Sequence, residues 1–159
     1  MFESGKKLAE LIEQGGVYAS LKGNNLREVL AAFTGALPPA LSVPREKLLG
    51  AVLEREKLMS TSIGKGIALP HPRTQLIDSP KDEFVAVAYL ENPVDWNSLD
   101  GERVDTLMLI ISAAPKHHLE LLSKINYLCR QENFFRLLKA RANLEELVPF
   151  IRDAEKKWT

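Results

Sequence analysis

The chain has 159 residues, with 21 lysines and arginines against 21 aspartates and glutamates, so its formal net charge is zero. This length predicts one domain, and a hydrophobic content of 45% with 26% charged residues predicts a packed core and excludes a largely disordered chain. A balanced charge argues against a dedicated nucleic-acid binder, which would carry a basic surplus. The longest apolar runs are too short to span a membrane and we read no secretory signal, so we expect no membrane insertion. Cys129, the single cysteine, cannot form an internal disulfide and favours a reducing cytoplasm.

The N-terminal part of the chain predicts helices. Residues 3–14 form a short helix that ends at Gly15-Gly16, within an N-terminal helical segment that we assign to residues 1–20. A better-marked helix follows, which either Asn24 or Asn25 can cap and which two prolines terminate. Its apolar residues recur at helical spacing and are Leu26, Val29, Leu30, Phe33 and Leu37.

The middle of the chain changes from helical to extended patterns. A third helix opens at Pro44 and continues to residue 59, and a stretch rich in small and turn-forming residues occupies 60–73. The apolar runs 84–90 and 104–111 are each bounded by turn residues, which is typical of strands buried on both faces. Between these two strands, turns at Asn92-Pro93 and Asp100-Gly101 leave residues 94–96 as a candidate short strand.

After Pro115 the pattern returns to helices. One long apolar stripe and a shorter helical piece over 134–139 precede a last helix, which Asn143 and Glu146 begin as a capping box. We expect Pro149 to kink or divide that helix. The order helices, strands, helices predicts an α/β fold, a single domain in which helices sandwich a mixed β-sheet.

The histidines are the candidate reactive groups. Neither a zinc-protease HExxH pattern nor a GxSxG nucleophile elbow occurs, and the glycines at 64 and 66 lack the spacing of nucleotide-binding loops. His71 lies between Pro70 and Pro72, which restrict the backbone on both sides of it. A fixed histidine on a loop that leaves a strand suits a reactive role, and it equally suits a tight turn.

His118 lies at the N-terminal end of the apolar stripe that follows Pro115. It could cap the edge of the core, or it could stand at a helix N-terminus where exposed N–H groups attract anions. His117 points about 100° around the helix from His118, and we expect it to face solvent.

Arg55 ends the third predicted helix, shortly before the stretch that leads to His71. It could pair with Glu54 or Glu56 as an ordinary surface arginine, or it could present its guanidinium fork to a phosphoryl group. Lys65 and Arg73 are nearby cations with the same two interpretations.

Two segments together resemble a known family. The segment LEREKLMSTSIGKGIALPHPR (53–73), followed by residues 84–125, is similar to the enzyme IIA domain of the bacterial sugar phosphotransferase system, fructose–mannitol type, which includes nitrogen-regulatory paralogues. The shared features are RE-x-x-x-ST-x-IG-x-GIA-x-PH, a strand, a D-x-x-x-VD segment and a histidine-leucine pair that opens a helix. The likeness covers residues from about 24 to 157, and we assign residues 21–159 to a IIA type-2 domain.

The resemblance implies a phosphotransferase component that works without metal or cofactor. By position, His71 is the histidine that accepts a phosphoryl group from the HPr-type carrier protein, and Arg55 and His118 accompany it at the phosphoryl site. Pro72 departs from the family, which often has a small residue there, and it should stiffen the loop.

The resemblance leaves the role of the protein open. The phosphoryl group could pass to a IIB component during sugar transport, or phosphorylation could regulate binding to a target protein. Because no IIB or membrane domain accompanies this sequence, regulation is slightly favoured. The remaining alternative is a non-catalytic binding module whose partner binding depends on the state of His71.

Overall fold

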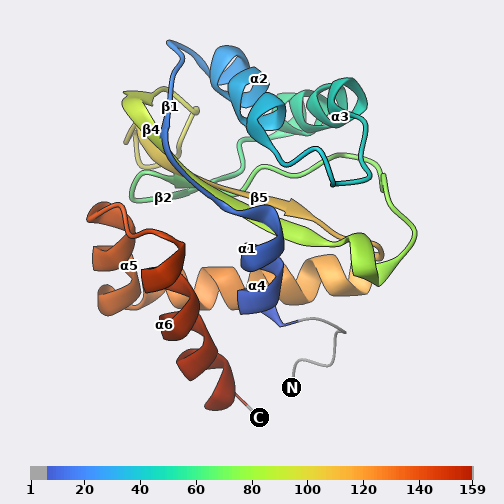
Figure 1. The fold of residues 1–159 in the computed structure, drawn as a ribbon. Coiled ribbons are helices and arrows are strands. Elements are labelled where there is room, and N and C mark those ends of the chain that lie inside the picture. The colour runs from blue at the N-terminus through green and yellow to red at the C-terminus, as the bar shows by residue number, and fades with distance from the viewer. Residues whose placement is uncertain (1–6, 159) are drawn as a thin grey trace.

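The computed structural model describes residues 7–158, which form one domain around a five-stranded sheet (Figure 1). The strands are β1 (Val17–Leu21), β2 (Ser62–Gly64), β3 (Ile67–Ala68), β4 (Phe84–Val94) and β5 (Val104–Ile111), and their order in the sheet is β1-β4-β5-β3-β2. The central strands β4 and β5 are antiparallel. β1 runs parallel to β4 and β3 runs parallel to β5, whereas β2 is antiparallel to β3 at the edge. The predicted mixed sheet is confirmed.

Helices cover both faces of this sheet (Figure 1). One face packs against α2 (Leu26–Ala36) and α3 (Arg45–Leu58). The other face packs against α1 (Leu8–Gly15), α4 (Pro115–Arg130), α5 (Glu132–Lys139) and α6 (Leu144–Lys156). A short 3-10 helix, η1 (Pro80–Asp82), leads into β4. The predicted sandwich of a sheet between helices is therefore confirmed.

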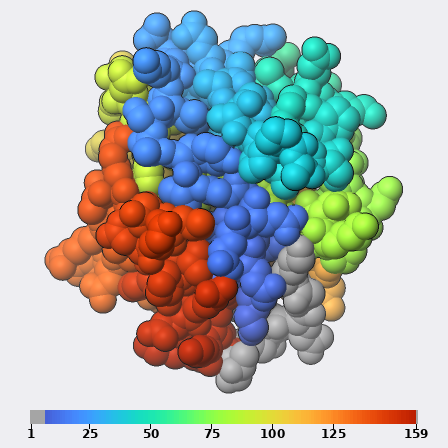
Figure 2. All heavy atoms as spheres, viewed as in Figure 1, coloured from blue at the N-terminus to red at the C-terminus, as the bar shows by residue number. Residues whose placement is uncertain are grey.

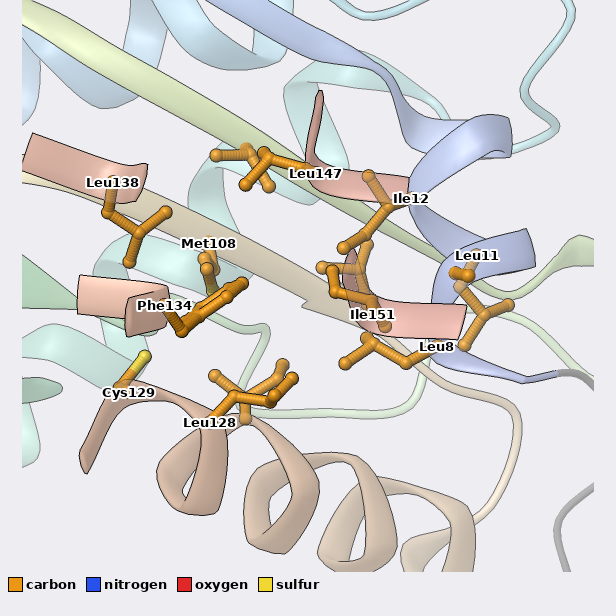
Figure 3. Close-up of a cluster of buried hydrophobic side chains, with 14 of the residues drawn as sticks. Leu8, Leu11, Ile12, Met108, Leu128, Cys129, Phe134, Leu138, Leu147 and Ile151 are labelled. Atoms are coloured by element: carbon orange, nitrogen blue, oxygen red, sulfur yellow. The ribbon is translucent and has the colours of Figure 1, made fainter. Parts of the chain in front are cut away.

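The two central strands build both halves of the core because their side chains alternate between the faces. Along β4, Val85, Val87 and Tyr89 join the cluster under α4, α5 and α6, whereas Phe84 and Ala86 join the cluster under α2 and α3. In the first cluster, side chains from α1 and α6 meet Met108 of β5 and the apolar faces of α4 and α5 (Figure 3). A strand buried on both faces needs apolar residues at every position, which explains the unbroken apolar run 84–90.

The N-terminal helix is held to the C-terminal helix by one buried carboxylate. Glu155 of α6 accepts hydrogen bonds from the backbone N–H groups of Leu8 and Ala9, at 2.9 and 3.1 Å, and from Lys124 Nζ at 3.1 Å. The blue N-terminal segment accordingly lies beside the red C-terminal helix on the surface of the molecule (Figure 2).

The helix predictions are confirmed, with small shifts at their ends. Asn25 caps α2, since its side chain accepts the Glu28 N–H at 2.9 Å, and Asn143 with Glu146 forms the expected capping box of α6. α3 begins at Arg45, one residue after Pro44. Pro149 does not divide α6, which is continuous over Leu144–Lys156. The expected N-terminal helix is α1, and residues 3–6 of that prediction lie outside the described residues.

The strand predictions were less complete. Asn92-Pro93 is not a turn: β4 continues to Val94, which pairs with Val104 after a register irregularity. Proline is tolerated at such an irregularity, because no ladder donor is required of it there. The separate strand expected over 94–96 is therefore wrong. The short strands β1, β2 and β3 were not predicted, because two to five residues carry too little periodicity to recognise.

Candidate functional site

The loop that carries His71 is fixed by backbone hydrogen bonds to three neighbouring elements. The Leu69 N–H donates to the Thr61 carbonyl, the Ile110 N–H of β5 donates to the Pro70 carbonyl, and the Arg73 N–H donates to the Ala51 carbonyl of α3, each at 3.0 Å. Two prolines flank the histidine within this segment. The backbone on both sides of His71 is thus restrained by both covalent geometry and hydrogen bonding.

A single hydrogen bond defines the tautomer of His71. Its Nδ1 lies 2.9 Å from the carbonyl oxygen of Leu69, and because a carbonyl can only accept, Nδ1 carries the hydrogen. In the neutral ring the lone pair is therefore on Nε2. Burial lowers the pKa of His71, the hydrogen bond to Leu69 partly opposes that shift, and the nearby charge of Arg55 adds to it. His71 is consequently a neutral imidazole at pH 7 with one nucleophilic nitrogen.

His118, in the first turn of α4, lies directly beside His71. The ring centroids are 4.5 Å apart and the ring planes are inclined at 55°. Burial lowers the pKa of His118 to about 4, with further contributions from His71 and Arg55. A neutral ring carries one N–H, so His118 can donate one hydrogen bond while remaining uncharged.

Arg55 reaches the same site from the last turn of α3. Its Nη1 donates to the Met59 carbonyl at 2.7 Å, which fixes the guanidinium near the helix end. No ion pair with Glu54 or Glu56 occurs in the part of the chain described. Glu56 instead accepts hydrogen bonds from the backbone and hydroxyl of Thr61. The ordinary surface pairing expected as one alternative is therefore not formed.

These three side chains line one cavity of about 280 Å³. The start of α4 forms one wall, where Ala114 precedes the helix and Pro115 is its first residue. The first helical hydrogen bond runs from the His118 N–H to the Ala114 carbonyl, so the N–H groups of residues 116 and 117 precede the helical ladder. The positive end of the helix dipole adds to the charge of Arg55. The lining residues are Arg55, His71, Pro72, Arg73, Thr74, Gln75, Ile110, Ser112, Ala114, Pro115 and His118.

The structure separates the other two candidate cations. Arg73 lines the same cavity as His71, as its position in the sequence allowed. Lys65 lies in a different depression, where its Nζ is 5.4 Å from the centroid of the Phe135 ring and its backbone N–H donates to Asp100. Ser112 and Thr74 also line the cavity and were not predicted. Thr74 lies close to the proline-flanked loop in the sequence, which is a signal for it, whereas Ser112 has none.

His117 does not face solvent, and that expectation is wrong. Its Nδ1 lies 2.9 Å from Oε2 of Glu83, and its side chain is only 21% exposed. The helical rotation that separates it from His118 was correctly anticipated. What could not be anticipated is that residue 83, which immediately precedes β4, lies beside the start of α4.

Two further classes of site find no support among residues 7–158. No group of three or more histidine, cysteine, aspartate or glutamate side chains is arranged to hold a metal ion. No helix in this range has the length and apolar character that a membrane crossing requires.

Comparison with known proteins gives concordant matches over nearly the whole chain. Residues 10–154 match the family model of the phosphoenolpyruvate-dependent sugar phosphotransferase system, EIIA 2. The nitrogen regulatory protein of Pseudomonas aeruginosa is 30% identical over 152 residues, which cover 94% of this chain and 97% of that protein. The fructose-specific EIIABC component of Bacillus subtilis is 27% identical over 153 residues, which cover 94% of this chain and 24% of that protein.

Solved structures share the fold. The nitrogen regulatory protein IIA-Ntr of Neisseria meningitidis superimposes with a TM-score of 0.78 at 22% identity, covering 90% of this chain and 97% of that one. The mannitol enzyme IIA of Escherichia coli, solved in complex with phosphorylated enzyme IIB, superimposes with a TM-score of 0.68 at 16% identity, covering 87% of this chain and 94% of that one.

Proposed function

The chain belongs to the phosphoenolpyruvate-dependent sugar phosphotransferase system EIIA 2 family, and from this membership we propose that it carries a phosphoryl group on Nε2 of His71. The observation that carries the proposal is the hydrogen bond between Nδ1 of His71 and the Leu69 carbonyl at 2.9 Å. It commits one ring nitrogen as a donor and leaves the other, with its lone pair, as the nucleophile. The lowered pKa of His71 keeps that lone pair available at neutral pH.

The phosphoryl donor in this proposal is a phosphohistidine on an HPr-type carrier protein. Nε2 of His71 attacks the phosphorus, a new N–P bond forms, and the N–P bond of the donor breaks with its electron pair returning to the donor imidazole. Nδ1 keeps its hydrogen throughout, and the Leu69 carbonyl stabilises the positive charge that the phosphorylated ring acquires. Such a transfer depends on positioning and on neutralisation of the phosphoryl oxygens.

The cavity supplies both of these requirements. Arg55 places a permanent positive charge beside the two histidines, and a guanidinium can contact two phosphoryl oxygens at once. His118 is neutral, so it can donate a hydrogen bond to a phosphoryl oxygen without repelling the nearby Arg55. The N–H groups at the start of α4 add donors on the same side.

Two fates of the phosphoryl group follow from the relatives. Transfer to a IIB component is the role suggested by the mannitol IIA fold, which was solved with phosphorylated IIB. Regulation of a target protein is the second candidate, favoured by the 30% identity to a nitrogen regulatory protein over 94% of this chain. Both roles use the same phosphorylated histidine.

The test is phosphorylation by the complete donor system. Incubation with enzyme I, HPr and labelled phosphoenolpyruvate should give a phosphoprotein that is labile in acid and stable in base. His71→Ala should abolish the label and leave the fold intact, because a half-buried loop side chain contributes little to the core. Label that persists in His71→Ala would refute the assignment.

A further inference from the structure

Glu83, which immediately precedes β4, is a buried carboxylate that lies beside the start of α4. Phe84 at the start of β4 pairs with Ile111 at the end of β5, so the residue before Phe84 lies next to the segment that leaves β5. Glu83 is 1% exposed, and its Oε2 accepts the Ala113 N–H at 2.8 Å and the Nδ1–H of His117 at 2.9 Å. Oε2 of Glu83 therefore binds Ala113, which precedes α4, and His117, which lies within its first turn.

These two contacts hold the start of a helix that has no side-chain cap. The residue at the cap position is Ala114, which has no side-chain oxygen to accept a hydrogen bond from the first turn. The Glu83 carboxylate instead holds the residue before the cap and, through His117, the first turn itself. A negative charge is also favourable at the N-terminus of a helix.

The segment that Glu83 contacts, at Ala113 and His117, forms one wall of the cavity that holds His71. Ser112, Ala114, Pro115 and His118 all line the cavity, and all belong to the stretch whose position Glu83 and His117 determine. Neither Glu83 nor His117 lines the cavity. Any effect they have on phosphoryl transfer therefore acts through the position of His118 and of the helix start.

We infer that Glu83 and His117 are a positioning pair, which holds His118 at its distance from His71 in the geometry that phosphoryl transfer requires. This inference rests on the proposed function. A displacement of about 1 Å at a reacting centre can cost about a hundredfold in rate, so a device that fixes one helix turn has a kinetic consequence.

A second carboxylate in the same molecule provides a matched control. Glu155 is 2% exposed, accepts two backbone N–H groups at the start of α1 and also binds a basic side chain, so it resembles Glu83 in burial and in bonding. Neither α1 nor α6 contributes a residue to the cavity wall, and the basic partner Lys124 lies in α4 six residues after His118, away from the helix start. Glu155→Ala should therefore destabilise the fold without affecting transfer.

The experiment measures single-turnover transfer from phosphorylated HPr at varied donor concentration. In His117→Ala and Glu83→Ala we expect the maximal rate to fall about tenfold to a hundredfold, with the half-saturating donor concentration unchanged. His117→Asn keeps a donor near the Nδ1 position, and Glu83→Gln keeps one acceptor oxygen, so both should stay within about threefold of the wild-type rate. If Glu83→Ala does not fold, His117→Ala carries the test.

Equal maximal rates in wild type, His117→Ala and Glu155→Ala would overturn the inference. A second readout does not depend on phosphorylation: the through-space NMR contact between the rings of His71 and His118. We expect this contact to weaken in His117→Ala and to persist in Glu155→Ala. If even the wild type accepts no phosphoryl group, the proposed function fails, and the positioning role is supported or overturned by the NMR contact alone.

Discussion

The imidazole of His118 lies against that of His71, with ring centroids 4.5 Å apart, although the two residues come from different elements of the fold. Burial disfavours a proton on either ring, and for His118 the neighbouring His71 and Arg55 add to this effect, because positive charges at this distance would repel one another. The pKa of His118 is lowered to about 4, and that of His71 is also lowered. One site thus holds two neutral imidazoles beside the permanent charge of Arg55.

Removal of the donor should slow transfer without abolishing it. In His118→Ala we expect the single-turnover rate of transfer from phosphorylated HPr to fall by a factor of about ten to a thousand, the range for the loss of one positioned donor. His71 is still present, so label should accumulate at long times. A rate equal to wild type would show that His118 belongs to the core edge and takes no part in transfer.

Arg55 should act through the shape of its guanidinium as well as through its charge. Arg55→Lys keeps the positive charge but loses the planar fork, so we expect slower phosphorylation and nearly unchanged thermal stability. Arg55→Ala should be slower still. If both variants react as fast as wild type, the guanidinium serves only to bind the Met59 carbonyl at the end of α3.

The stability of the protein should decrease in weak acid because of the histidine pair. The folded-state pKa of His118, about 4, is below the ordinary 6.5, so between these values the unfolded chain binds more protons than the folded one. The free energy of unfolding should therefore fall as pH falls from 6.5 to 4, by about 1 to 2 kcal/mol for a ring that is partly screened by water.

His118→Ala provides the comparison for this pH effect. The free energies of unfolding of wild type and His118→Ala should be measured with urea at several pH values. We expect the advantage of wild type over His118→Ala to shrink steadily as the pH falls below 6.5. Parallel curves over that range would contradict the assignment of the acid sensitivity to His118.

Two helical glycines should respond to alanine in opposite directions. A Cβ at Gly15 would lie 2.3 Å from the carbonyl oxygen of Val85, a backbone atom that cannot move aside, so we expect Gly15→Ala to lower the free energy of unfolding by about 2 to 4 kcal/mol. A Cβ at Gly50, on the exposed side of α3, meets no atom within 4 Å. Gly50→Ala should raise the free energy of unfolding by about 0.5 to 1 kcal/mol. Chemical denaturation measures both, and a tolerated Gly15→Ala would show that α1 is not held against β4 as described.

The sequence was informative where a pattern extends over many residues or where chemistry restricts the backbone. The helices, the two central strands and the fold class follow from periodicity. The Asn25 cap of α2 and the capping box of Asn143 with Glu146 follow from the residue types at the helix starts. Local patterns left the roles of His71, Arg55 and His118 open. The resemblance to the IIA family is what implies them as site residues, and all three line one cavity.

The features that were missed depend on contacts between distant segments. β1 is a strand only because it pairs with β4, and a five-residue segment in which only Leu21 is buried does not signal that partner. His117 was expected to face solvent because the helix rotation was considered alone. Its partner Glu83 is 34 residues away in the sequence and comes close only because Phe84 of β4 pairs with Ile111 of β5. No local pattern contains such information.

The loop of His71 is anchored to β5, to α3 and to the segment before β2 through backbone atoms alone. Main-chain hydrogen bonds of this kind persist when side chains are exchanged, provided that proline is not introduced at a donor. The exposed side chains that follow His71, from Arg73 to Gln75, are thus free to diverge without displacing it. In the proposed carrier, the preference for a partner, set by residues 73–75, can therefore evolve separately from the chemistry of His71.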